Sequence, residues 1–350
     1  MNTARQFQGF SWVILSVLLM FGWCGPLAAA PYSGGDGTSD TPYLLSTVAD
    51  LAALANTPAD WGKWFILTAD LDLRSASWAT PIGSRTQPFT GVFDGAGHSL
   101  KGPVINDTAA SSRPLGLFGV LGALALVERL QLVAPSVQST GNMSVGALAG
   151  EVALDATVQQ CSVDLGSVST PSSDAAGGLI GDNSGTVREC YSTASVKALG
   201  LAGGLLGRST GLIENCGAAG TVTSLKVGTG TAAGGLMGAD VGGTIRFCMA
   251  NSPSITSERP GGLVGFASDT TVLTNCVCNR VAPKAVENWT ADIPGSAWCE
   301  EASNLSSVTF FAGLGCDDLM AALGKLLLQS PADTVFIIHN EDRSVHLFIP

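Results

Sequence analysis

The residues best suited to chemistry are three carboxylates near the N-terminus. Asp70 and Asp72 are two positions apart in a strand-like apolar stretch, so they share one face of it, and Asp94 stands in a Gly-rich turn. Carboxylates of this kind could hold Ca²⁺ or serve as the acid and base of a glycosidase. The alternative is that Asp94-Gly95 is a turn signal and that Asp70 and Asp72 satisfy backbone groups, with His98 also structural. We favour this second, structural interpretation.

Cysteines are the other chemically notable residues. Five of them follow equivalent polar turns in a repeated pattern: Cys161, Cys190, Cys216, Cys248 and Cys276. Export of the chain would favour disulfides, but stacked in-register residues hold their Cβ atoms slightly too far apart for one. We therefore expect a buried core ladder of reduced, packing thiols. Cys299 and Cys316 lie outside the pattern and are the better disulfide candidates. With three histidines and no Cys-x-x-Cys pair, we expect no metal site and no cofactor.

A repeat positions these cysteines. A Gly-Leu-x-Gly-like segment precedes each one by about ten residues, with Leu130 in place of the cysteine in the first copy. The units are rich in Gly, Ser, Thr and Val, which favour short strands and turns over helices. Asp182, Arg208 and Asp240 follow motif glycines and are expected in turns. The closing glycines of the motif are Gly119, Gly150, Gly181, Gly207, Gly238 and Gly265.

Such units can bury their apolar residues only against the units above and below them. The expected fold is all-β, a right-handed parallel β-helix (solenoid) with rungs about 4.8 Å apart. We expect an N-terminal cap that contains a short helix over residues 48–55, with Thr47 as its N-cap. A small α+β C-terminal segment should contain a helix over 317–329 and strands over 334–339 and 344–349.

The chain divides into five parts. Arg5, an apolar run over residues 10–23 and small residues at 28–30 indicate a signal peptide, residues 1–30. Residues 31–42 are expected to be a linker, 43–105 the N-terminal cap and first coils, and 106–285 the β-helix repeats. Residues 286–350 form either a C-terminal cap or the start of a further domain. No apolar stretch long enough to span a membrane follows the signal segment.

Charge excludes some partners. The net charge is −11 and the pI about 4.6, and the chain has no basic run, so a nucleic-acid partner is not expected. Four Asn-x-Ser/Thr sequons would be N-glycosylation sites in a eukaryotic host: Asn106, Asn142, Asn288 and Asn304.

Two signatures in sequence carry a family resemblance. Residues 67–73 (Leu-Thr-Ala-Asp-Leu-Asp-Leu), Pro-Ile-Gly at 81–83 and Phe-Thr-Gly-Val-Phe-Asp-Gly-Ala-Gly-His at 89–98 precede the repeated Gly-Gly-Leu-x-Gly and Asn-Cys segments. Over residues 43–281 the chain resembles the GLUG-repeat proteins, which are extracellular, surface-associated β-helix proteins with a pectin-lyase-like fold. It departs from their pattern at Ala147, Glu189 and Phe247, and at Leu130.

The resemblance implies adhesion or binding rather than one particular chemistry. We expect a non-catalytic, secreted or cell-surface protein whose partner is an extracellular glycan or protein. A polysaccharide lyase or glycosidase of the same fold, and a fragment of a larger surface protein, remain alternatives. The repeat also occurs in some zinc-dependent IgA-cleaving peptidases, whose His-Glu-x-x-His motif this sequence lacks.

Overall fold

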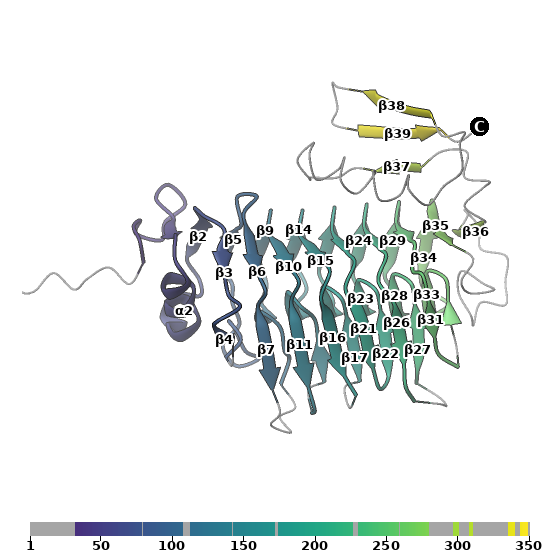
Figure 1. Ribbon diagram of the computed structural model, residues 1–350, viewed down its shortest axis with the longest axis horizontal. Helices are drawn as coiled ribbons and strands as arrows, with labels where there is room; N and C mark the ends of the chain where they lie inside the picture. Colours follow the sequence, from purple (N-terminus) through teal and green to yellow (C-terminus); the bar gives the residue numbers. More distant parts are fainter. Residues whose placement is uncertain are drawn as a thin grey trace, which may run out of the picture. The chain divides into compact units, whose positions relative to one another are not determined.

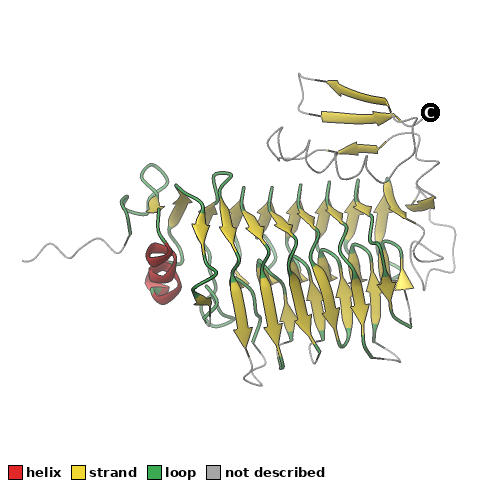
Figure 2. Ribbon diagram, viewed as in Figure 1, coloured by secondary structure: helices red, strands yellow, loops and turns green. Residues whose placement is uncertain are grey.

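The computed structural model describes residues 32–279, apart from 79, 108–112, 142, 172–173, 227–229 and 259, together with the backbone of short strands between 297 and 348. Within 32–279 the chain winds into successive coils, and the coils add strands to five parallel sheets (Figures 1 and 2). The predicted parallel solenoid is confirmed. No helix among the described residues is long and apolar enough to cross a membrane.

The five sheets are named A to E. Sheet A contains β1 (Tyr43–Leu45), β2 (Trp64–Leu67), β5 (Val92–Asp94), β9 (Leu126–Glu128), β14 (Thr157–Gln159), β19 (Thr186–Arg188), β24 (Leu212–Glu214), β29 (Thr244–Arg246) and β34 (Val272–Thr274). Sheet B contains β3 (Leu71–Asp72), β6 (Ser99–Lys101), β10 (Gln131–Val133), β15 (Ser162–Asp164), β20 (Tyr191–Ser192), β25 (Gly217–Ala218), β30 (Met249–Ala250), β35 (Cys276–Asn279) and β36 (Ala297–Glu300). Sheet C contains β4 (Ser77–Trp78), β7 (Val104–Asp107), β11 (Ser136–Ser139), β16 (Ser167–Thr170), β21 (Ser195–Ala198), β26 (Val222–Ser224) and β31 (Ile255–Thr256). Sheet D contains β8 (Phe118–Leu121), β13 (Ala149–Val152), β18 (Ile180–Asn183), β23 (Leu206–Ser209), β28 (Met237–Asp240) and β33 (Val264–Ala267). Sheet E contains β12 (Ser144–Val145), β17 (Ala175–Gly177), β22 (Leu201–Gly203), β27 (Ala232–Gly234) and β32 (Pro260–Gly261).

The core is built from columns of equivalent side chains. A strand of three residues points one side chain inward, and in-register pairing places that residue above its counterpart in the next coil. In sheet A the inward column is fully or almost fully buried and includes Val127, Val158, Val187, Ile213, Ile245 and Leu273. Each such side chain contributes about 1.5–3 kcal/mol of hydrophobic stabilisation when buried.

The N-terminal end is covered by a helix, α2 (Val48–Asn56), and a 3₁₀ turn, η1 (Pro58–Asp60). Thr47 and Asp50 form a reciprocal capping box, so the predicted helix and its N-cap are confirmed. Leu51 and Leu54 of this helix are fully buried. The Trp61 indole N–H donates to the Leu54 carbonyl at 2.8 Å. This cap hides the open end of the solenoid core.

Residues 32–42 fold onto the cap instead of forming a linker. Tyr32 is 4% exposed and packs against Tyr43 and Phe65, with ring centroids 4.4 and 5.5 Å away. Its hydroxyl donates to Asp60 at 3.0 Å, and the N–H of Ser33 donates to the Leu44 carbonyl at 3.1 Å. The Gly-rich composition of the segment suggested a linker, but one buried aromatic ring anchors it.

The corner between sheets A and B has a fixed backbone conformation. The residue before each of the five repeat cysteines, and before Leu130, is left-handed, with φ between 51° and 55°. The six residues are Arg129, Gln160, Glu189, Asn215, Phe247 and Asn275. Asparagine tolerates this region better than other residues with a side chain, which explains the Asn-Cys pairs of the repeat. Glu189 and Phe247 adopt the same conformation at a conformational cost.

The motif glycines are required by close approach of neighbouring coils. A Cβ on Gly178 would lie 2.2 Å from the Gly204 carbonyl oxygen, and one on Gly204 would lie 2.2 Å from that of Gly235. None of these three glycines has a positive φ. Steric contact between coils, rather than a left-handed conformation, therefore excludes a side chain here.

Beyond the coils, β37 (Val308–Phe310), β38 (Val335–His339) and β39 (Ser344–Phe348) form an antiparallel sheet in the order β37-β39-β38. The last two strands correspond to the strands predicted over 334–339 and 344–349. The predicted signal peptide and the helix expected over 317–329 lie outside the described residues.

Candidate functional site

The predicted carboxylates do not converge on one site. Asp70 accepts a hydrogen bond from the Ser99 backbone N–H at 3.0 Å and forms an ion pair with the Lys101 ammonium at 2.8 Å. The His98 ring nitrogen lies 3.4 Å from the same carboxylate. The hydrogen bonds from Lys101 and Ser99 hold the pKa of Asp70 well below its usual range. Asp70 is therefore ionised at neutral pH, which does not suit a general acid.

The other two carboxylates are bound to separate arginines. Asp72 pairs with Arg74, whose hydrogen bonds lower the pKa of Asp72 to about 2. Asp94 pairs with Arg129 and also accepts the Ala96 backbone N–H at 2.7 Å. Each acid thus has a structural partner of its own. Among the described residues, no group of three or more His, Cys, Asp or Glu side chains is placed to hold a metal ion.

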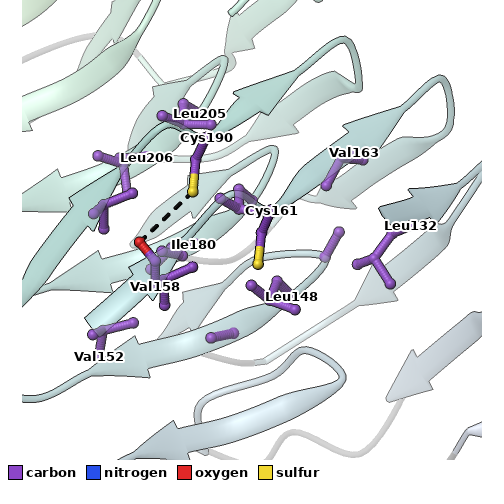
Figure 3. Packing of buried hydrophobic residues seen from close by; sticks show 14 of the residues in the cluster. Leu132, Leu148, Val152, Val158, Cys161, Val163, Ile180, Cys190, Leu205 and Leu206 are labelled. Atoms are coloured by element: carbon purple, nitrogen blue, oxygen red, sulfur yellow. Dashed lines mark hydrogen bonds between the residues drawn. The ribbon is translucent and has the colours of Figure 1, made fainter. Parts of the chain in front are cut away.

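The five repeat cysteines occupy one position in successive coils, because the residues that flank them pair in register. All five are free thiols and at most 3% exposed. Each Sγ lies 3.6–3.8 Å from a carbonyl oxygen of the preceding coil, as Cys190 does at 3.7 Å from Val158 (Figure 3). The thiols therefore serve as weak donors to carbonyl groups of the sheet A strands.

Burial sets the reactivity of this column. It raises the pKa of Cys190 and of Cys248 well above that of a free thiol. At these two residues the thiolate, which is the reactive form, is accordingly suppressed. Cys278, which lies two residues after Cys276 on β35, is disulfide-bonded. Its backbone register partner on β36 is Cys299. The predicted Cys299–Cys316 pair involves Cys316, which lies outside the described residues.

A row of four charged side chains combines three residues on neighbouring strands of sheet D with Arg85 from a preceding loop. Glu151, Asp182 and Arg208 follow one another in register on β13, β18 and β23. Arg85 pairs with Glu151, with Nε 3.0 Å from Oε2, and Arg208 pairs with Asp182, with Nε 3.1 Å from Oδ2. The two arginine side chains are about half exposed and the two carboxylates less than a quarter. We call Arg85, Glu151, Asp182 and Arg208 the charged row.

A pocket of about 230 Å³ adjoins the charged row at Arg208. Its lining includes Asp174, Leu199, Gly200, Leu201 and Lys226. These residues come from three successive coils, where the chain passes from sheet C to sheet E. The pocket thus combines two cations, one carboxylate and an apolar wall, the composition of a site for a small polar ligand.

Sequence reasoning missed the charged row. Asp182 and Arg208 were expected in turns, but both lie within strands and form an ion pair across them. The available signal was position: Glu151, Asp182 and Arg208 each stand directly after a closing glycine. Residues at the same place in a repeat stack in one column, so three charges there would have predicted the row.

Asp240, also expected in a turn, is fully buried at the end of β28. Its Oδ2 accepts the Gly243 N–H at 2.8 Å and the Thr271 hydroxyl at 2.6 Å, while Oδ1 has no hydrogen-bond partner among the described residues. Asn183 and Ser209 precede it in the same column and bind turn N–H groups in the same way. Burial raises the pKa of Asp240.

Among the predicted sequons, Asn106 lies on β7 with its side chain exposed. The other three, Asn142, Asn288 and Asn304, lie outside the described residues.

Comparison with known proteins agrees with this architecture. The GLUG motif matches residues 198–223, which contain β22, β23, β24 and β25. The crystal structure of a putative immunoglobulin A1 protease from Bacteroides ovatus superimposes with a TM-score of 0.63 over 91% of this chain and 96% of that one, at 22% identity. This likeness concerns the fold alone. The chain therefore carries a GLUG motif within a parallel β-solenoid, and both features agree with the resemblance seen in the sequence.

Two curated relatives share part of the sequence. A putative Gly-rich membrane protein of Evansella cellulosilytica is 32% identical over 148 residues, and halomucin of Haloquadratum walsbyi is 33% identical over 157 residues. These segments cover 40% and 42% of this chain but only 17% and 2% of the relatives. The chain thus spans a small part of either relative.

Proposed function

We propose that this protein is a non-catalytic, secreted or cell-surface β-solenoid that binds an extracellular glycan or protein. The observation that carries the proposal is the charged row beside a pocket on in-register strands. Stacked coils hold such side chains at fixed spacing, so binding a ligand costs little ordering of the protein. The names of the relatives, a membrane protein and a mucin, support a place at the cell surface.

The state of the predicted catalytic acids supports binding rather than catalysis. General acid–base chemistry needs one carboxyl group that stays protonated near the working pH. Asp70 and Asp72 instead have lowered pKa values because cations and N–H groups hold them ionised. A polysaccharide-cleaving enzyme would have better candidates in Glu151 and Asp182, which are neighbours on β13 and β18. Both, however, are paired with arginines.

An array of immobilised glycans and extracellular proteins tests the proposal. The chain without residues 1–30 should bind a defined subset, and Arg208→Gln should weaken that binding because it breaks the charged row beside the pocket. Arg188→Gln on sheet A is the matched control, since it removes an exposed arginine that hydrogen-bonds Gln159. Failure of the protein to bind any glycan or protein on the array would contradict the proposal.

A further inference from the structure

The pocket beside Arg208 has a floor shaped by close backbone contact. Leu201 donates its N–H to the Asp174 carbonyl at 2.7 Å, and a Cβ on Gly200 would lie only 2.4 Å from that same oxygen. The buried Ser224 hydroxyl donates to the Gly200 carbonyl at 2.6 Å. The concave wall is therefore fixed by hydrogen bonds between coils and by a glycine that cannot be enlarged without displacing backbone.

The two cations of the pocket, Arg208 and Lys226, differ in whether they have an ion-pair partner. Arg208 is neutralised by Asp182, to which its Nε and one terminal nitrogen donate. Its other terminal nitrogen, Nη1, forms no hydrogen bond with any described residue. Lys226 is exposed and forms no ion pair with any described residue. Its backbone N–H is bonded to the Leu199 carbonyl at 3.0 Å, which fixes the base of the side chain at the pocket wall. Lys226 is thus a cation available to a ligand.

We infer that this pocket binds one carboxylate-bearing sugar residue of an extracellular glycan, an inference that rests on the proposed function. Lys226 and the remaining donor of Arg208 would hold the carboxylate, Asp174 would accept sugar hydroxyl groups, and Leu199 and Leu201 would contact the apolar face of the ring.

The size of the pocket and the overall charge of the protein narrow the range of acidic glycans that could bind. A volume of 230 Å³ lies below the range of about 300–1,000 Å³ typical of drug-sized ligands, which favours a single ring. The net charge of −11 repels a polymer that carries a carboxylate on every residue. A glycan with an occasional or terminal acidic sugar meets both conditions.

The test compares acidic sugars with matched neutral ones. The probes are the methyl glycosides of glucuronic, galacturonic and N-acetylneuraminic acid, each beside its carboxyl-reduced counterpart, titrated into the chain without residues 1–30. At least one acid should bind about tenfold more tightly than its reduced form, because a charge-assisted hydrogen bond is about twice as strong as a neutral one. Lys226→Gln should remove this preference and Lys226→Arg should retain it. Lys197→Gln, an exposed lysine on sheet C, should leave the affinity unchanged.

Two results would overturn the inference. One is equal affinity for acidic and reduced forms across all three pairs, which includes the case in which none binds. The other is a preference for the acids that survives Lys226→Gln. In either case the array experiment separates the two proposals, because binding of another ligand there leaves the proposed function intact.

Discussion

Replacing Gly204 with alanine should destabilise the solenoid through contact between two coils. The new Cβ would lie 2.2 Å from the Gly235 carbonyl oxygen and 2.8 Å from the Ala218 Cβ. Ordinary contacts are about 3.5–4.0 Å, so the oxygen would have to retreat by about 1.3 Å or more. Its coil is held in place by neighbouring bonds, among them Leu205 N–H to the Leu236 carbonyl at 2.8 Å.

The expected loss follows from these distances. Overpacking a well-filled core costs about 1–3 kcal/mol, and alanine returns about 0.4–1 kcal/mol by restricting the unfolded chain. Urea unfolding of Gly204→Ala, followed by circular dichroism, should therefore show a free energy of unfolding lower by about 1–2 kcal/mol.

Gly62→Ala provides the matched control. Its Cβ would come no closer than 3.5 Å to any neighbour, Thr90 Oγ1, and Gly62 has no positive φ. This variant should be as stable as the wild type or slightly more so. Identical unfolding midpoints for Gly204→Ala and Gly62→Ala would refute the argument from close approach.

Three further predictions follow from single residues. Asp240→Asn should be more stable than the wild type at pH 7, on the order of 1 kcal/mol, because a neutral amide replaces a buried carboxylate whose burial disfavours the charged form. Since burial raises the folded-state pKa of Asp240, the wild type loses stability as pH rises from about 4 through that pKa. The stability advantage of the variant should therefore vanish below about pH 4. A difference in stability that does not change with pH would contradict this. Phe247→Asn should raise the free energy of unfolding by about 1 kcal/mol, since Phe247 is half exposed at φ 55°; a destabilised variant would show that its ring packs usefully. The five column thiols should resist alkylation in the native protein and react in urea, as mapped by peptide mass spectrometry, whereas labelling of Cys216 in the native state would show that the coil opens.

The sequence was sufficient to predict the fold because the repeat encodes it at every level. The spacing of the closing glycines and cysteines determines the length of each coil. The buried column from Val127 to Leu273 follows from the same register. The left-handed corner could also be inferred from the Asn-Cys pairs at Asn215 and Asn275, although the variants Glu189 and Phe247 conceal it.

The candidate site was harder to predict, for two physical reasons. The repeat places Glu151, Asp182 and Arg208 in one column, but Arg85, which completes the charged row, comes from a loop that precedes the repeats and that the repeat pattern does not place. The pocket at Lys226 arises from loops between sheets C and E, whose paths the strand pattern does not determine. Conversely, Asp70 and Asp72 are close in sequence but are bound to different cations.

Binding without cleavage is the central claim, and one measurement tests both halves of it. The chain without residues 1–30 is incubated with a panel of extracellular polysaccharides, and protein retained on the polymer and new reducing ends are measured in the same sample. The account predicts retention on at least one polymer with no new reducing ends. Release of reducing ends that is lost in Glu151→Gln or Asp182→Asn, while circular dichroism stays native, would contradict it and identify the protein as an enzyme.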